Sequence, residues 1–298
     1  MAIKLKKLED QVMVITGASS GIGLATAQAA ARKGTKVVLA ARSQKTLEKI
    51  VKQLEAEGAH AVAVVADVSD RDQVQEIADM AIARFGRIDT WVNNAGLSIY
   101  GRLDEVSEED SRRLFDTNFW GIVHGSLVAL PHLKKHGGAL INVGSEVSEA
   151  VVPLQGMYSA TKHAVKGFTD ALRVEIEQVD QALVSITLIQ PTAVNTPFPQ
   201  HARNYMAQEP KLPDPQIDPE KVAEAILDAA AKPTHHAKVG FQAKLNTFVA
   251  NNAPKIADRM AAGYVEKQQR DEPPRNADGT LYIPGEGGET HGLPTPSR

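Results

Sequence analysis

Short runs of Val, Ile, Leu and Ala alternate along this chain with longer amphipathic stretches, and this alternation limits the folds that it can adopt. The runs that predict strands are residues 12–16, 36–41, 61–67, 88–96, 139–145, 183–191 and 235–240. The stretches that predict helices are residues 22–34, 43–58, 70–85, 107–117, 119–135, 156–178 and 219–231. Strands without polar alternation are typical of a sheet buried on both faces, and helices of crossover length connect parallel strands. The sequence therefore predicts an α/β fold with a doubly wound parallel sheet of about seven strands, covered by helices on both faces.

The last part of the chain has a different pattern. Residues 241–269 keep a helical pattern in two pieces, broken at Pro254, whereas residues 271–298 contain five Gly and five Pro and show no periodicity. The composition of this tail is typical of disorder, or of a segment ordered only by a partner surface. We therefore divide the chain into a domain of residues 1–240 and a C-terminal extension of residues 241–298, helical to about residue 269 and irregular from residue 270. The helical part can pack on its own domain, bridge subunits or lie on a membrane, and we expect a subunit contact.

The overall composition excludes several classes of function. With 33 basic and 36 acidic residues the net charge is −3, and no basic cluster indicates a nucleic-acid partner. The absence of Cys excludes disulfides, thiolate nucleophiles and Cys-ligated zinc, and it suits a reducing compartment. His235 and His236 are adjacent on a predicted strand, so they point to opposite faces and form no metal pair. No apolar run reaches the roughly 18 residues of a membrane helix, and the basic start lacks the apolar stretch of a signal peptide. We expect a cytoplasmic protein without a membrane span or a bound metal.

A glycine-rich turn, "TGASSGIG" at residues 16–23, joins the first predicted strand to the first helix. Gly17, Gly21 and Gly23 permit a tight turn and a close approach of the backbone to a pyrophosphate. The helix that follows offers free N–H groups and the positive end of its dipole to the anion. A plain strand-to-helix turn needs only one Gly, so the turn predicts a dinucleotide site.

Arg42 stands at the end of the second predicted strand, where many nucleotide-binding folds place an Asp or Glu. A cation at the start of a helix opposes the helix dipole, which favours a specific role over that of a solvated side chain. An Arg at this position can hold the 2′-phosphate of NADP through paired hydrogen bonds, so we expect NADP rather than NAD. Asp67, at the end of the third predicted strand, is placed to meet the adenine ring, and capping of the next helix is the alternative.

Tyr158 and Lys162 lie four residues apart in a predicted helix, so their side chains share one face. A free phenol has a pKa of about 10 and is a poor base at neutral pH. A nearby ammonium lowers the pKa of a phenol, and a positively charged nicotinamide ring acts in the same direction. The pair is a candidate acid/base device for a carbonyl oxygen, although Tyr-x-x-x-Lys by itself is usually a solvated helix face.

Further polar residues lie at or after the ends of predicted strands. Ser145 ends the run 139–145 at the edge of the sheet where ligands bind, so its hydroxyl can hold a substrate oxygen beside Tyr158. "NNAG" (93–96) follows the fourth strand, and Asn118 lies in a later helix. Each has a structural alternative: a helix cap for Ser145, turn chemistry for the Asn pair, and a bond to nearby backbone for Asn118.

These motifs together resemble the short-chain dehydrogenase/reductase family over about residues 8–240. The resemblance rests on "TGASSGIG", "ADV", "NNAG", Asn118, Ser145, "YSATK" and "QPTAVNTP", in this order and at the family spacing. It implies a single Rossmann domain that binds NAD(P) at the strand ends and transfers hydride between nicotinamide and a carbonyl or alcohol carbon. "AARS" resembles NADP-preferring members, in agreement with the argument from Arg42.

The resemblance also implies roles for individual residues. Tyr158 would be the acid/base, and Lys162 would lower its pKa and hold the nicotinamide ribose. Ser145 would polarise the substrate oxygen, and Asn118 would position a water that links Lys162 to solvent. The residues expected at the cofactor are Gly17, Ser19, Ser20, Gly21, Ile22, Gly23, Arg42, Asp67, Val68, Asn94, Ala95, Gly96, Tyr158, Lys162, Pro191, Thr192, Val194 and Thr196.

The sequence departs from the family pattern in three places. Pro191-Thr192 replaces the usual Pro-Gly, so the backbone that leads to the amide contacts expected near Val194 and Thr196 lacks the freedom of Gly. Glu146 and Glu149 follow Ser145 closely; we expect exposed loop carboxylates, with discrimination against anionic substrates as the alternative. The extension after Gly240 exceeds the usual family end.

The Pro-rich loop 197–218 lies where the family places its substrate lid. Phe198, Tyr205 and Met206 are expected to line an apolar pocket for a medium-sized carbonyl compound, unless they only anchor the loop to its own domain.

We therefore expect an NADP-dependent oxidoreductase, working as a reductase in cells rich in NADPH, and a homodimer or homotetramer, as is usual in the family. A non-catalytic NADP-binding regulator of the same fold is the alternative. It predicts loss of Ser145, Tyr158 or Lys162, and all three are present. An epimerase or dehydratase that uses the hydride transiently is a third possibility, but such relatives usually carry a larger C-terminal substrate domain.

Overall fold

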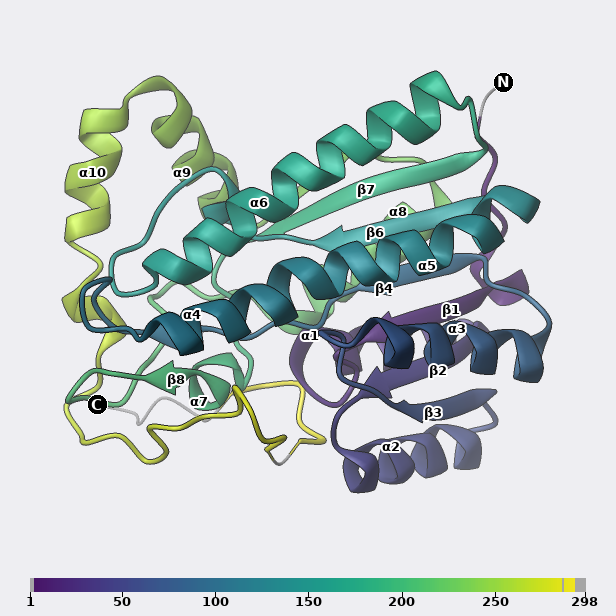
Figure 1. Ribbon diagram of the computed structural model, residues 1–298, viewed down its shortest axis with the longest axis horizontal. Helices are drawn as coiled ribbons and strands as arrows, with labels where there is room; N and C mark the ends of the chain where they lie inside the picture. Colours follow the sequence, from purple (N-terminus) through teal and green to yellow (C-terminus); the bar gives the residue numbers. More distant parts are fainter. Residues whose placement is uncertain (1–2, 286, 293–298) are drawn as a thin grey trace.

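The computed structural model describes residues 3–285 and 287–292 (Figure 1). A seven-stranded sheet has the order β3-β2-β1-β4-β6-β7-β9, and each neighbouring pair of strands is parallel. The strands are β1 (Val12–Thr16), β2 (Lys36–Ala41), β3 (Ala61–Val65), β4 (Thr90–Asn93), β6 (Gly138–Val143), β7 (Val184–Pro191) and β9 (His236–Val239). The order reverses direction at β1, so the predicted doubly wound fold is confirmed.

The two faces of the sheet carry separate cores. Residues of α1 (Gly21–Arg32), α2 (Gln44–Ala56) and α8 (Pro219–Ala231) belong to one apolar cluster, and residues of α3 (Arg71–Phe85), α5 (Gly121–His136) and α6 (Gly156–Arg173) belong to the other. Alternate residues of β1 enter the two clusters, because successive side chains of a strand point to opposite faces. This explains why the strand runs of the sequence lack polar alternation.

The helices predicted at residues 107–117 and 119–135 form one continuous helical segment. α4 (Glu108–Phe115) passes into a π-helical turn, Asp116–Trp120, and then into α5, while Asp116 and Gly121 keep right-handed helical dihedrals. α6 likewise passes into a π-helical turn, Val174–Val179. Such turns often occur at functional sites, and the first of them carries Asn118.

A small second sheet holds the loop after β7. β5 (Ile99–Tyr100) pairs in parallel with β8 (Arg203–Asn204), and the short helix α7 (Phe198–His201) precedes β8. None of these three elements was predicted from the sequence, because each has four residues or fewer and a hydrophobic period shows only over longer stretches.

The extension is partly as predicted. α9 (Phe241–Asn252) and α10 (Pro254–Ala262) are separated at the predicted break before Pro254, and a 3₁₀ turn follows at Glu266–Gln268. The described tail residues beyond this turn form no helix or strand, but the expectation of disorder is wrong for them. The tail returns to the main domain, where Leu281 is only 1% exposed (Figure 1). Among the described residues, we find no helix with the length and apolarity needed to cross a bilayer.

Candidate active site

A cavity of about 250 Å³ lies at the carboxyl ends of the strands. It extends from the glycine turn after β1, past the ends of β2 and β3, to the residues that follow β4, β6 and β7. The predicted site residues that line it are Gly17, Ser19, Ser20, Gly21, Ile22, Arg42, Asp67, Val68, Asn94, Ala95, Gly96, Ser145, Tyr158, Lys162, Pro191, Thr192, Val194 and Thr196. Gly23 and Asn118 were also predicted, and they lie behind this lining.

The glycine turn is packed too closely to accept side chains. Gly17 has φ of +66°, and a Cβ atom there would lie 2.7 Å from the Cα of Ala95. A Cβ atom on Gly23 would lie 2.2 Å from the carbonyl oxygen of Gly17. Asn94 supports the turn by donating its side-chain amide to the carbonyl of Thr16 at 2.9 Å. Gly23 is therefore needed for the shape of the turn rather than for its exposed surface.

Asp67, two residues after the end of β3, forms an ion pair with Arg113. Its carboxylate accepts a hydrogen bond from Arg113 at 2.5 Å and further bonds from the N–H and hydroxyl of Ser69. Burial acts to raise the pKa of Asp67, but the bonds from Arg113 and Ser69 outweigh it and lower the pKa. The alternative role as a helix cap is wrong, because Asp70 accepts the N–H groups of the first turn of α3.

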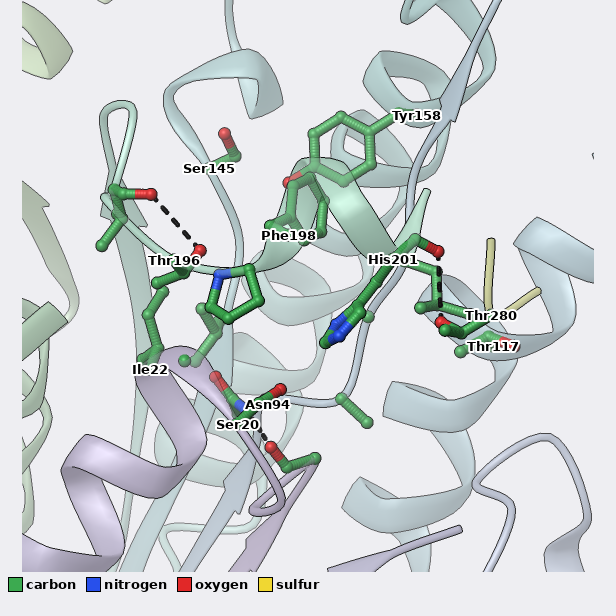
Figure 2. A pocket seen from close by; sticks show the side chains of 18 of the residues that line it. Ser20, Ile22, Asn94, Thr117, Ser145, Tyr158, Thr196, Phe198, His201 and Thr280 are labelled. Atoms are coloured by element: carbon green, nitrogen blue, oxygen red, sulfur yellow. Dashed lines mark hydrogen bonds between the residues drawn. The ribbon is translucent and has the colours of Figure 1, made fainter. Parts of the chain in front are cut away.

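Ser145 and Tyr158 lie on one side of the cavity, across from Ser20 and Asn94 (Figure 2). Ser145 directly follows Gly144 at the end of β6 and caps a 3₁₀ turn, so its Oγ accepts the N–H of Val147 at 3.3 Å. This bond uses a lone pair of the hydroxyl, and the hydroxyl proton remains for a bond to the oxygen of Tyr158. Ser145 therefore caps this turn, as the structural alternative predicted, and also lines the cavity.

Lys162 lies on the same face of α6 as Tyr158, one helical turn away. Its Nζ is 5.7 Å from the centre of the Tyr158 ring and donates to the carbonyl oxygen of Val143 at 2.9 Å. Burial lowers the pKa of Lys162 to about 8.

The expected lowering of the Tyr158 pKa is not what the structure shows. Burial raises the pKa of Tyr158, the negative charge of Glu146 adds to the rise, and hydrogen bonding with Ser145 acts in the opposite direction. The ammonium of Lys162 is itself buried and bonded to a backbone carbonyl, so it does not reverse the effect of burial. Burial therefore favours the protonated phenol.

Asn118 is fully buried in the π-helical turn. Its Oδ1 accepts the N–H of Leu97 at 2.8 Å, and its Nδ2 donates to the carbonyl of Leu97 and to the hydroxyl of Thr161. The amide thus fixes the loop after β4, and the backbone that it bonds lies far away in sequence rather than nearby. Its role in positioning a water stays a prediction.

The two carboxylates after Ser145 are not the exposed loop groups that we expected. Glu146 accepts hydrogen bonds from the hydroxyl of Thr192 at 3.1 Å and from the amide of Asn246 at 3.0 Å. Glu149 accepts bonds from Gln190 of β7, Lys238 of β9 and Asn251 of α9. Both therefore attach α9 to the turn that carries Ser145. Burial raises the pKa of Glu146 despite its two hydrogen bonds.

Apolar side chains gather beside Tyr158. The ring of Phe198 makes an edge-on contact with the ring of Tyr158, with centres 5.5 Å apart. The expectation for Tyr205 and Met206 is wrong, since neither lines this cavity. The Tyr205 hydroxyl instead bonds Asp110 at 2.7 Å, which anchors the loop.

Several lining residues were missed by the sequence analysis. They include Thr117, Val152, Gln155, His201, Leu212, Pro213, Thr280, Pro284 and Gly285. The last three come from the tail, where the apolar run at residues 281–283 was the available signal for an anchored segment.

Comparisons with known proteins agree with this geometry. A model of the short chain dehydrogenase family matches residues 11–207. The uncharacterized oxidoreductase YxnA of Bacillus subtilis is 45% identical over 288 residues, which cover 95% of this chain and 81% of the relative. An alcohol dehydrogenase from Thermococcus sibiricus, solved with 5-hydroxy-NADP, has a TM-score of 0.66 and 33% identity, with 77% of this chain and 94% of that chain covered. A short chain dehydrogenase/reductase from Burkholderia phymatum, solved with NAD, has a TM-score of 0.72 and 27% identity, with 91% and 100% covered.

Proposed function

This chain belongs to the short-chain dehydrogenase family, and from that premise we propose that it is an NADP-dependent oxidoreductase acting on a carbonyl or secondary alcohol. The observation that carries the proposal is the shape of the cavity. One end is a glycine turn without room for side chains, and the other holds Tyr158, Lys162 and Ser145.

The lining residues fit a nicotinamide dinucleotide. Gly17, Ser19, Ser20, Gly21 and Ile22 would hold the pyrophosphate on backbone N–H groups, as the start of a helix does for anions. Arg42, Asp67 and Val68 would surround the adenosine. Residues 94–96 would contact its ribose. Pro191, Thr192, Val194 and Thr196 would meet the nicotinamide. A bound cofactor of this kind would supply or accept the hydride.

The NADP preference rests on Arg42. A guanidinium recognises a phosphate better than it recognises a ribose hydroxyl, because the hydrogen bonds are assisted by opposite charges. Structural relatives have been solved with an NADP derivative and with NAD, so the family alone does not select one cofactor.

In the direction of reduction, Tyr158 would act as the general acid. A phenol whose pKa is raised keeps its proton at neutral pH and can donate it to a carbonyl oxygen as hydride reaches the carbon. The Ser145 hydroxyl, which hydrogen-bonds with Tyr158, would donate to the same substrate oxygen. The Lys162 ammonium would stabilise the phenolate that remains, since an opposite charge favours the ionised form.

The surroundings of Tyr158 indicate the class of substrate. Phe198, Val152 and Leu212 line the cavity together with Pro213, which favours a medium-sized, apolar carbonyl compound. We also infer a cytoplasmic homodimer or homotetramer. Phe241 and Phe248 on α9 are 76% and 65% exposed, and such side chains would be covered in a subunit contact.

The test is Tyr158→Phe assayed on a panel of ketones, aldehydes and quinones by NADPH absorbance. Loss of a general acid is expected to lower turnover by about 10²- to 10⁴-fold while cofactor binding is kept. Tyr264→Phe, outside the lining of this cavity, is the matched control and should retain normal turnover. Near-normal turnover of Tyr158→Phe on any carbonyl substrate would show that the acid/base role is wrong.

A further inference from the structure

The C-terminal tail lies across the end of the cavity that is expected to hold adenosine. We call residues 279–285 and 287–292 the strap. Its residues Thr280, Pro284 and Gly285 line the cavity. The N–H of Gly288 donates to the carbonyl of Ser19 at 2.8 Å, and the N–H of Gly21 donates to the carbonyl of Glu289 at 2.9 Å. The strap therefore rests on the glycine turn itself.

Carbonyl oxygens of the strap accept hydrogen bonds from the guanidinium of Arg42. Nη2 of Arg42 donates to the carbonyl of Thr280 at 2.5 Å, and Nη1 donates to the carbonyls of Leu281 at 3.2 Å and Tyr282 at 3.4 Å. Arg113 adds a bond from its Nε to the same Leu281 carbonyl, at 3.2 Å. Both terminal nitrogens of the expected phosphate-binding residue thus already have main-chain partners.

Side chains on the strap hold these carbonyls in place. Leu281 is 1% exposed and packs in an apolar cluster with Leu97, Ile99 and Leu114. The hydroxyl of Tyr282 donates to Asp110 at 2.8 Å. The N–H of Thr280 donates to the carbonyl of His201 at 2.8 Å, and its hydroxyl donates to the same carbonyl at 3.1 Å, beside the cavity (Figure 2).

The strap carbonyls take at most three of the five N–H groups of Arg42, all of them on the two Nη atoms. A ribose 2′-phosphate has negatively charged acceptor oxygens, which cannot bond the carbonyl oxygens and are repelled by them, so the phosphate and the carbonyls compete for the two Nη atoms. A ribose 2′-hydroxyl has a proton to donate and can bond a strap carbonyl without displacing it.

We propose that the strap determines cofactor choice by competing with the 2′-phosphate for Arg42, so that NADP(H) binding displaces residues 280–282 and NAD(H) binding does not. This inference rests on the proposed nicotinamide cofactor. It adds a determinant of cofactor choice that lies outside residues 11–207, which match the family model. The seated strap lowers the preference for NADP that Arg42 would otherwise give.

The test is to unseat the strap in the full chain with Leu281→Asp, which places a charge in the apolar cluster. Dissociation constants for NADPH and NADH are measured by fluorescence titration. Release of the Gly21 N–H from Glu289 should help the pyrophosphate of both cofactors, whereas release of Arg42 should help only the 2′-phosphate. We therefore expect the gain in affinity to be at least about tenfold larger for NADPH than for NADH, since hydrogen bonds to a charged group no longer have to be broken. Ile283→Asp is the matched control, because Ile283 is 75% exposed, and it should leave both constants unchanged.

Arg42→Ala, alone and combined with Leu281→Asp, identifies the residue for which the strap competes. The larger gain for NADPH than for NADH should disappear in the Arg42→Ala background. A second measurement needs no substitution: in the wild-type chain, NADPH but not NADH should speed amide hydrogen exchange in peptides that cover residues 279–285.

The outcomes separate the two proposals. Equal changes for both cofactors, weaker NADPH binding in Leu281→Asp, or exchange that does not respond to NADPH would overturn the role of the strap. A wild-type chain that binds neither nucleotide would instead refute the proposed function, and the strap's role with it.

Discussion

Replacing Gly23 by Ala would place a methyl carbon where the glycine turn has no space. The new Cβ would lie 2.2 Å from the carbonyl oxygen of Gly17 and 2.6 Å from the side-chain nitrogen of Asn94, whereas ordinary contacts begin near 3.4 Å. The carbonyl is backbone and cannot rotate away, so the turn would have to shift by about 1 Å, and such overpacking costs about 1–3 kcal/mol. Ala is better than Gly inside a helix by up to about 1 kcal/mol, so we expect a net loss of about 1–2 kcal/mol in the free energy of unfolding. Because the shift moves the N–H groups that would hold the pyrophosphate, cofactor affinity should fall at least about tenfold.

Gly167→Ala is the matched control for this substitution. Gly167 lies within α6, and a Cβ atom there would meet no atom within 4 Å. The same change should therefore raise the free energy of unfolding by about 0.5–1 kcal/mol through helix propensity. Urea denaturation measures both effects, provided that the m-values agree, and nicotinamide fluorescence measures the affinity. The reasoning fails if the two variants shift stability in the same direction, or if Gly23→Ala binds cofactor as tightly as the wild-type chain.

Two further predictions concern the polar groups around the end of the cavity that holds Tyr158 and Lys162. The pKa of Lys162 is lowered to about 8, so its ammonium is present below that pH and is lost above it; kcat/KM for reduction should therefore fall as the pH rises through about 8. In Lys162→Arg the cation persists and this limb of the pH–rate profile should vanish, and a limb that stays at the same pH would assign it to another group. Asn246→Ala removes a hydrogen bond to the half-buried carboxylate of Glu146 and should cost about 1 kcal/mol of stability and a few-fold in kcat/KM. Asn252→Ala removes an exposed amide that donates to the carbonyl of Phe248 in its own helix, and it should change neither quantity. Equal effects of the two variants would contradict the proposed link between α9 and the site.

Features that depend on local chemistry could be predicted from the sequence. The strand runs, the glycine turn and the shared face of Tyr158 and Lys162 follow from periodicities of two and of 3.6 residues and from the space that Gly leaves. These patterns were sufficient to place nearly every expected cofactor residue along one cavity, because the carboxyl ends of parallel strands meet at one edge of the sheet.

Features that depend on distant contacts could not be predicted. The strap holds Arg42 through carbonyl oxygens, and every residue carries one, so no side-chain pattern marks residues 280–282 as its partners. The upward shift of the Tyr158 pKa comes from burial, which helical spacing does not reveal. The exposed-loop expectation for Glu146 failed for a similar reason, because its partners Thr192 and Asn246 lie far along the chain.

The order of strands also has a consequence for how the chain is made. β2 and β3 add in turn to one side of β1, and β4, β6, β7 and β9 then add in turn to its other side. Among the described strands of this sheet, none has to be inserted between two that have already paired. A chain that leaves the ribosome can therefore extend the sheet outward at its open edges as it emerges. The strap is translated after all the described strands, so the end of the cavity beside β2 and β3 stays uncovered during synthesis, and a nucleotide of the proposed kind can enter it before the last residues arrive.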